Sequence, residues 1–190
     1  MNNNEKYLFI VSGPAGVGKD SVVQAMRAQH PEIERSVTAT TRAPRPGEVE
    51  GVNYYYYSVE AFEKLKAEGG VLESNFFCGN YYGTVRHDVD HRLAAAKPVV
   101  LVIDVNGAAS IKQIYPGATT IFINPPSPEE LEKRLRGRAT ESEEKILERL
   151  EKAWGELDAG AQYQEKIVND TLEHAAEAVY AIICKYTNEG

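Results

Sequence analysis

The chemistry of this chain starts at a glycine-rich turn near its amino terminus. Seven consecutive residues match the pattern G-x-x-x-x-G-K: Gly13, Pro14, Ala15, Gly16, Val17, Gly18 and Lys19. Glycines let the backbone curl until several N–H groups face one anion, and the lysine reaches the outer phosphates. Because the turn directly follows an apolar run and precedes a helical pattern, we predict a nucleotide phosphate site rather than an incidental glycine-rich turn.

The residue after the lysine departs from this pattern. Asp20 stands where a Ser or Thr hydroxyl normally holds a magnesium ion, and Ser21 follows it. A carboxylate is a stronger metal ligand than a hydroxyl, but it adds negative charge beside phosphates. Two interpretations stay open: Asp20 holds Mg²⁺, or Asp20 only favours the start of the helix.

A second segment, residues 38–48, combines two arginines with a stiff backbone. Arg42 and Arg45 lie three residues apart, and Pro44 and Pro46 restrict the chain beside them. Two planar guanidinium groups at this spacing suit a phosphate monoester. Alone, such a segment would more often be a polar surface loop. Beside the glycine-rich turn and the tyrosines at 54–57, we favour a second phosphate site.

The elements that must position these residues follow from the hydrophobic pattern. Short apolar runs predict strands buried on both faces, as in a parallel sheet, at residues 7–11, 99–103 and 120–123. Helical patterns occupy residues 20–29, 85–96, 128–135, 143–157 and 172–186. In the fourth helix one apolar face is predicted from Ile146, Leu147, Leu150, Trp154 and Leu157. Alternating strands and helices predict an α/β fold.

Composition and charge exclude several classes of protein. The 190 residues include 21 Lys+Arg and 28 Asp+Glu, and the resulting net charge of −7 argues against a general binder of nucleic-acid polymers. No stretch approaches the roughly 20 apolar residues that cross a bilayer, and the first residues lack the order of a signal peptide. Two cysteines, Cys78 and Cys184, make no disulfide framework. We therefore expect a cytoplasmic protein without a membrane partner.

Two segments, about 36–84 and 128–150, break the alternation and look like insertions. Several stretches together resemble the guanylate kinase family, in its order and at its spacing across nearly the whole chain: the glycine-rich turn and residues 40–48, 79–84, 103–107, 134–141 and 168–170. The resemblance implies a single domain over 1–190. Its P-loop kinase core would be a parallel sheet flanked by helices, formed by residues 1–35, 85–127 and 151–190. Residues 36–84 would bind GMP, and residues 128–150 would form a helical lid.

The resemblance also implies an activity, transfer of the γ-phosphoryl group of ATP to GMP and also to dGMP, with Mg²⁺ accompanying ATP. Residues carried over to the GMP phosphate are Arg42, Arg45, Tyr54 and Tyr82. Those carried over to the guanine base are Glu73 and Asp104, completed by Thr38 and Thr84. Guanine presents two adjacent donors, N1–H and the 2-amino group, where adenine presents none, and ionised carboxylates only accept. Such a site discriminates strongly between the two bases.

The remaining carried-over residues would serve ATP and the transfer itself. Arg134, Arg138 and Arg149 match the family's lid arginines, which with Lys19 and Arg42 would neutralise the transferred phosphoryl group. Residues 13–21, Arg134, Arg138 and Asn169 would bind ATP, the last at its adenine. The family usually has a carboxylate at position 102, where this chain has valine. We hypothesise that Asp20 takes over part of its role near the metal.

Two other functions compete with guanylate kinase. A relative that phosphorylates ribose 1,5-bisphosphate has a P-loop resembling residues 18–21, but a guanine reader at Glu73 and Asp104 is useless to a sugar phosphate. A non-catalytic, guanylate-kinase-like protein-binding domain typically has eroded phosphate sites, whereas this chain keeps Lys19 and its lid arginines. Guanylate kinase is the favoured function, and both a monomer and a homodimer fit the sequence.

Overall fold

The computed structural model describes residues 4–77, 79–137 and 143–188. A five-stranded sheet with the order β2-β7-β1-β8-β9 forms its centre, and all neighbouring strands are parallel. The strands are β1 (Leu8–Ser12), β2 (Glu34–Arg35), β7 (Val99–Val102), β8 (Thr119–Asn124) and β9 (Glu165–Val168). The predicted α/β fold with a parallel sheet is thus confirmed. Among the described residues, no helix is both long enough and apolar enough to span a membrane.

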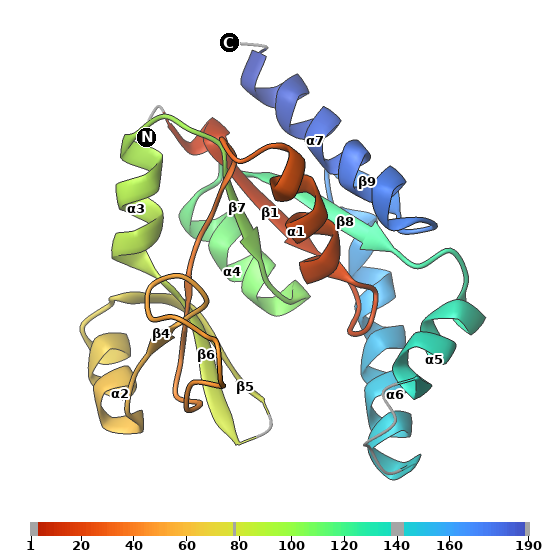
Figure 1. Cartoon of the computed structure of the whole chain (residues 1–190), viewed down its shortest axis with the longest axis horizontal. Coiled ribbons are helices and arrows are strands. Elements are labelled where there is room, and N and C mark those ends of the chain that lie inside the picture. Colours follow the sequence, from red (N-terminus) through yellow and green to blue (C-terminus); the bar gives the residue numbers. More distant parts are fainter. Residues whose placement is uncertain (1–3, 78, 138–142, 189–190) are drawn as a thin grey trace.

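Helices cover both faces of this sheet (Figure 1). Strand β1 shows the reason, because its side chains alternate between two hydrophobic cores: Phe9 and Val11 enter one core, Leu8 and Ile10 the other. The first core contains residues of α1 (Lys19–Gln29), α5 (Pro128–Arg136), α6 (Glu143–Ala159) and α7 (Leu172–Asn188). The second contains residues of α3 (Arg86–Ala94) and α4 (Val105–Ile114).

A second, four-stranded sheet has the order β4-β3-β6-β5. Its elements are β3 (Thr38–Thr40), β4 (Tyr55–Tyr56), α2 (Val59–Ala67), β5 (Val71–Phe77) and β6 (Asn80–Val85). Phe62 of α2 is fully buried in a small core with Ala39 and Val85. In Figure 1 this sheet and the pair α5–α6 extend to opposite sides of the carboxyl end of β1, where the glycine-rich turn lies.

Several sequence-based expectations about elements were incomplete or wrong. Helices α2 and α4 and strand β9 were not predicted; α4 contains a glycine and polar residues, and β9 buries only Ile167. In α6, Leu147 and Trp154 are 53% and 37% exposed, so the predicted apolar face is wrong at these two positions. The buried stripe runs instead through Ile146, Leu150 and Ala153. Leu147 and Trp154 each lie one residue, about 100° of helix, away from that stripe.

Candidate active site

The glycine-rich turn connects the end of β1 to the start of α1, as predicted. Gly13, Gly16 and Gly18 have φ angles of 151°, 84° and 95°, which other residues rarely adopt. A side chain at position 13 would also lie 2.4 Å from the Ile123 carbonyl oxygen. Lys19 Nζ donates to the carbonyl oxygens of Gly13 (2.6 Å) and Pro14 (3.1 Å), so its ammonium lies against the turn.

Two side chains from the carboxyl-terminal half hold the turn in place. Asn169 Nδ2 donates to the Val17 carbonyl oxygen at 2.7 Å, and Arg134 donates to the same oxygen at 3.4 Å. Arg134 also donates to the Asn169 carbonyl oxygen at 3.1 Å. These contacts brace the phosphate-binding turn from outside. Contact between Asn169 and adenine, expected from the sequence, stays a prediction.

Glu156 of α6 is a functional candidate that sequence analysis missed. Its Oε2 accepts the backbone N–H of Ala15 at 2.9 Å, although the residue is only 6% exposed. Burial lowers the pKa of the Lys19 ammonium, and the negative charges of Glu156, Asp20 and Asp104 oppose this shift. The available signal was positional: Glu156 lies three residues after Ala153, on the buried face of an otherwise amphipathic helix.

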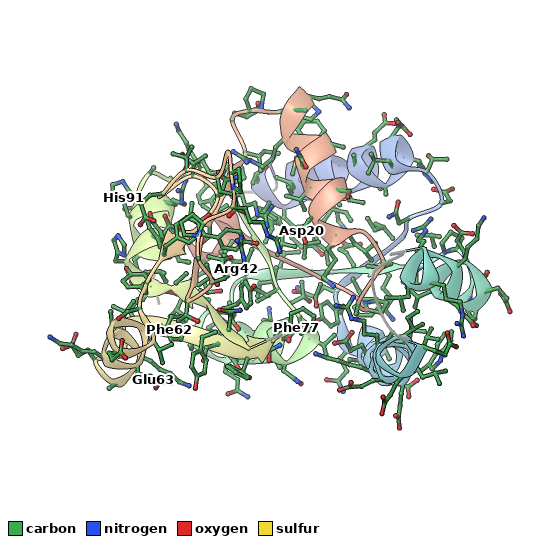
Figure 2. The ribbon with its side chains drawn as sticks, turned by 60° about the horizontal axis from the view of Figure 1, so that its bottom comes forward. Asp20, Arg42, Phe62, Glu63, Phe77 and His91 are labelled. Atoms are coloured by element: carbon green, nitrogen blue, oxygen red, sulfur yellow. The ribbon has the colours of Figure 1, made fainter. Side chains whose placement is uncertain are left out.

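A cavity of about 580 Å³ joins the turn to the second sheet. Three of its lining residues, Asp20, Arg42 and Phe77, lie between the second sheet and helices α5 and α6 in Figure 2. Predicted site residues that line it together are Ala15, Lys19, Asp20, Thr38, Arg42, Arg45, Tyr54, Glu73, Tyr82 and Asp104. Lining residues that were not predicted include Arg35, Asn75, Phe77, Lys152 and Glu156. One space therefore contains both predicted phosphate sites and both predicted base readers.

In the arginine loop, residues 42–48, a network of hydrogen bonds centred on Glu48 holds the side chain of Arg42 and the backbone of Arg45. Arg42 Nη2 donates to both carboxylate oxygens of Glu48, at 2.7 and 2.9 Å, and its guanidinium lies 5.3 Å from the centre of the Tyr54 ring. Glu48 also accepts the backbone N–H of Arg45 and the hydroxyl of Tyr56. The hydrogen bonds from Arg42, Arg45 and Tyr56 lower the pKa of the Glu48 carboxyl to about 2. The role of Glu48 as a holder of Arg42 was not predicted.

Two tyrosines stand beside the arginine loop. The rings of Tyr54 and Tyr82 make an edge-to-face contact with centres 6.2 Å apart, and both rings line the cavity. They line it together with Arg42 and Arg45. This arrangement of two cations and two hydroxyl donors suits one phosphate group.

The two predicted base readers meet at the amino end of α4. Asp104 caps this helix by accepting the Gly107 N–H at 2.8 Å, and its other oxygen accepts Asn75 Nδ2 at 2.6 Å. Glu73 accepts the Thr84 hydroxyl at 2.5 Å. Burial raises the pKa of the Glu73 carboxyl, the bond from Thr84 lowers it, and the charge of Asp104 raises it further. Thr84 thus lies behind Glu73 instead of lining the cavity.

Gly107 leaves room for this pairing of carboxylates. A Cβ atom at position 107 would lie 2.8 Å from a carboxylate oxygen of Glu73 and 3.4 Å from one of Asp104. With any side chain at this position, the Glu73 carboxylate would have to shift from where it now lies. Sequence analysis included Gly107 in a family motif but assigned it no role.

Asp20 has an ion partner that was not foreseen. Arg35 Nη2 lies 2.6 Å from Asp20 Oδ1, and the Asp20 side chain is 73% exposed. Ser21 is exposed as well. Gly18, not Asp20, is the N-cap of α1, but Asp20 lies in the first turn, where a negative charge favours the start of a helix. Arg35 adds a further cation to the cavity between the two phosphate sites.

Of the predicted lid arginines, the two that the structure describes, Arg134 and Arg149, do not line the cavity. Arg134 braces the glycine-rich turn as described above, and Arg149 places its guanidinium 5.3 Å from the centre of the Phe77 ring. Arg138 lies outside the described residues. The contact between Arg149 and Phe77 connects α6 to the end of β5, across one side of the cavity.

Comparison with known proteins agrees with this geometry. The family model described as guanylate kinase matches residues 5–186. The chain belongs to the guanylate kinase family. It is 48% identical to a guanylate kinase of Trichormus variabilis, covering 94% of this chain and 89% of that protein. A Synechococcus guanylate kinase is 51% identical over 87% of each chain.

A solved structure extends the likeness to three dimensions. The crystal structure of guanylate kinase from Anaplasma phagocytophilum superposes with a TM-score of 0.76 at 30% identity, covering 95% of this chain and 85% of that one. The guanylate kinase fold therefore accounts for the whole arrangement of two sheets and their helices. The resemblance found in the sequence is confirmed, and this protein is a phosphotransferase of that family.

Proposed function

We propose that this protein transfers the γ-phosphoryl group of ATP to GMP and produces ADP and GDP. The observation that supports it best is one cavity that Lys19 lines together with the two arginines, Arg42 and Arg45, and the two carboxylates, Glu73 and Asp104. A triphosphate on the turn and a monophosphate on the arginines would face each other there. Transfer chemistry requires this arrangement, because positioning and charge neutralisation supply most of the catalysis.

In this proposal the two parts beside the central sheet have separate roles. Residues 36–84 bind GMP, with Arg42, Arg45, Tyr54 and Tyr82 on its phosphate. Residues 128–150 form the lid over ATP, and residues 1–35, 85–127 and 151–190 form the core. The lid brings Arg134, Arg138 and Arg149 toward the phosphates and excludes water, which favours transfer over hydrolysis of ATP.

Recognition of guanine rests on Glu73 and Asp104. Their carboxylates accept the guanine N1–H and 2-amino hydrogens, with Thr38 beside them. Adenine offers no donor at either position, so with AMP the remaining acceptor capacity of two partly buried carboxylates would be cut off from water without a partner, and this is costly. Asn75 and Thr84, which donate to these carboxylates, fix their orientation.

In the transfer step, an oxygen of the GMP phosphate attacks the γ-phosphorus. The bond from this phosphorus to the β–γ bridging oxygen breaks, and ADP leaves. Lys19 stabilises the negative charge that develops on the phosphates during transfer. Arg42 holds the attacking phosphate in line with the bond that breaks. Glu48 occupies Nη2 of Arg42, so the GMP phosphate would bind through the other guanidinium nitrogens or replace part of this contact.

The donor chemistry of the cavity fits a magnesium ion brought by ATP. Mg²⁺ keeps several waters and needs one or two protein carboxylates beside substrate phosphates. Asp20 supplies one such carboxylate, whereas Val102, at the family's usual carboxylate position, supplies none. Within the described residues no cluster of three or more His, Cys, Asp or Glu could hold a metal alone. When bound, Mg²⁺ would neutralise charge on the β- and γ-phosphates.

A substrate panel tests the proposal. Purified protein would receive ATP and Mg²⁺ with GMP, dGMP, AMP or ribose 1,5-bisphosphate, and ADP formation would be followed. We expect kcat/KM to be highest for GMP, with dGMP accepted and AMP very poor. Preference for ribose 1,5-bisphosphate would replace the proposal with the sugar-phosphate kinase, and no turnover at all would favour a non-catalytic binding domain.

A variant of Glu73 tests the base reader separately. Glu73→Gln places an amide donor against guanine donors, so kcat/KM for GMP should fall by roughly 10²-fold or more. Glu68→Gln, an exposed change after α2, is the matched control and should behave as wild type. Unchanged GMP use by Glu73→Gln would remove Glu73 from the site.

A cytoplasmic location and a role in purine nucleotide recycling belong to the same proposal, since ATP and GMP are its substrates.

A further inference from the structure

Glu156 is a buried carboxylate at the place where phosphate is expected. It extends from α6, is 6% exposed, and accepts the Ala15 N–H within the glycine-rich turn. Backbone N–H groups of this turn are the donors that hold phosphate oxygens. The carboxylate of Glu156 therefore uses a donor of the kind that ATP requires.

The negative charge of Glu156 acts on two cations near the glycine-rich turn. Lys152 Nζ approaches it to 3.8 Å, and the charge of Glu156 also acts on Lys19 across the cavity wall. A buried carboxylate is tolerated only when hydrogen-bonded and near cations. A triphosphate placed on the same turn would compete for both the N–H donor and the cations, and its charge would repel the carboxylate.

Helix α6 connects this point to the proposed lid. It runs from Glu143, within the segment 128–150, to Ala159 beside the central sheet, so Glu156 lies near its core end. At position 149 of the same helix, Arg149 reaches Phe77 of the second sheet. A change in the hold of Glu156 on the turn would therefore be passed along one rigid element to the lid.

We propose that Glu156 is a positioning residue that couples the phosphate-binding turn to the lid: it holds the Ala15 N–H until a phosphate oxygen of ATP takes this donor, and its release lets α6 move. The coupling rests on the proposed function only for the identity of ATP. The exchange replaces one acceptor by another and involves no covalent step. It makes occupation of the turn and movement of the lid one event.

Two variants separate the charge from the hydrogen bond. Glu156→Gln keeps an acceptor oxygen for Ala15 but removes the charge, and Glu156→Ala removes both. The matched control is Glu151→Gln, an exposed carboxylate on the same helix. Thermal unfolding and circular dichroism identify any variant that fails to fold. Glu156→Gln is the decisive one because it preserves size and shape.

The measurements are ATP affinity and the fluorescence of Trp154, the single tryptophan, which lies on α6 two residues from Glu156. We expect Glu156→Gln to bind ATP about 3- to 10-fold more tightly, since a charged acceptor competes about twice as strongly as a neutral one. The change in Trp154 fluorescence on adding ATP should shrink. Glu151→Gln should match wild type in both measurements.

The opposite results overturn the coupling. If Glu156 is a fixed strut for the turn, Glu156→Gln binds ATP equally or more weakly, and its Trp154 response equals that of wild type. Neither measurement requires GMP or turnover. A protein that binds ATP but fails to phosphorylate GMP would thus contradict the proposed function and leave the coupling to be decided by these variants.

Discussion

The two proposed phosphate sites of this protein present their hydrogen-bond donors in different ways. The glycine-rich turn presents backbone N–H groups whose directions are fixed by positive φ angles and by the brace of Asn169 and Arg134. The arginine loop presents side chains, of which Arg42 is held by Glu48 while Arg45 is exposed. The backbone of the first site is shaped by the fold, whereas the second site consists of side chains that can change position.

A carboxylate of the chain occupies each site. The number of residues between this carboxylate and the donor that it binds differs sharply between the two sites. Glu48 is six residues from Arg42, within the same loop. Glu156 is 141 residues from Ala15, on a helix of another layer. Release of Glu48 therefore concerns one loop, whereas release of Glu156 concerns the position of α6. Glu48 therefore affects only the arginine loop, whereas Glu156 connects the glycine-rich turn to α6, the helix that moves in the proposed coupling.

The largest effect should come from the turn. Lys19→Met removes the cation closest to the transferred group, and we expect kcat to fall roughly 10³-fold. A coupled assay of ADP formation measures it. Lys97→Met, an exposed lysine before β7, serves as control and should keep full activity. A loss of less than about tenfold would mean that the side chains of the arginine loop, and not the turn, supply most of the stabilisation.

A smaller, selective effect should come from the arginine loop. Arg42→Lys keeps the charge but loses the planar fork, so kcat/KM for GMP should fall about 10- to 100-fold. ATP affinity should not change, because the turn is separate. Arg86→Lys on α3 controls for a general arginine effect. If ATP affinity falls together with GMP use, the two sites are not independent and the contrast between them fails.

The brace behind the turn should matter less than its lysine. Asn169→Ala removes the donor to the Val17 carbonyl oxygen, and the free energy of unfolding should fall by about 1–3 kcal/mol. ATP affinity should weaken several-fold, with GMP affinity unchanged; denaturant unfolding and titration calorimetry give the two values. Gln113→Ala, exposed on α4, is the control. Unaltered ATP affinity would show that the turn keeps its shape without the brace.

The smallest effect is a titration within the arginine loop. The pKa of Glu48 is about 2 in the folded protein, against 4.5 as its ordinary value. Because the folded value is the lower one, ionised Glu48 stabilises the fold above about pH 4.5, and this contribution is lost as the pH falls through about 2. Carboxyl-carbon NMR of Glu48 measures the pKa. Arg42→Ala should return it toward 4.5, and a wild-type value near 4.5 would mean that the pair does not form in solution.

The sequence predicted what is local and missed what is distant. The turn at 13–19 was predicted because its glycines, its lysine and the preceding strand are contiguous. The meeting of Glu73 with Asp104 came only from the family resemblance, since no spacing rule brings positions 31 residues apart together. Helix α4 was missed because the stretch after Asp104 was interpreted as a site motif and not as a helix start.

Glu156 and Arg35 show why the rest was not predictable. Each is a charged residue among other charged residues, and from the sequence alone such residues are predicted to be exposed to solvent. Only the packing of α6 against the turn makes Glu156 a partner of Ala15, and only the nearness of β2 to α1 makes Arg35 a partner of Asp20. Local propensity has no information about contacts between elements that the fold brings together.

The contact between Arg149 and Phe77 affects the relative populations of conformations in which α6 lies close to the second sheet or away from it. A partly exposed cation–π contact contributes about 0.5–1 kcal/mol, which changes the ratio of two populations only about two- to fivefold. The contact alone is thus too weak to trap a closed form and strong enough to favour it. Thermal motion breaks such a bridge readily, so this contact adds little to the hold that the proposed coupling gives Glu156 over α6.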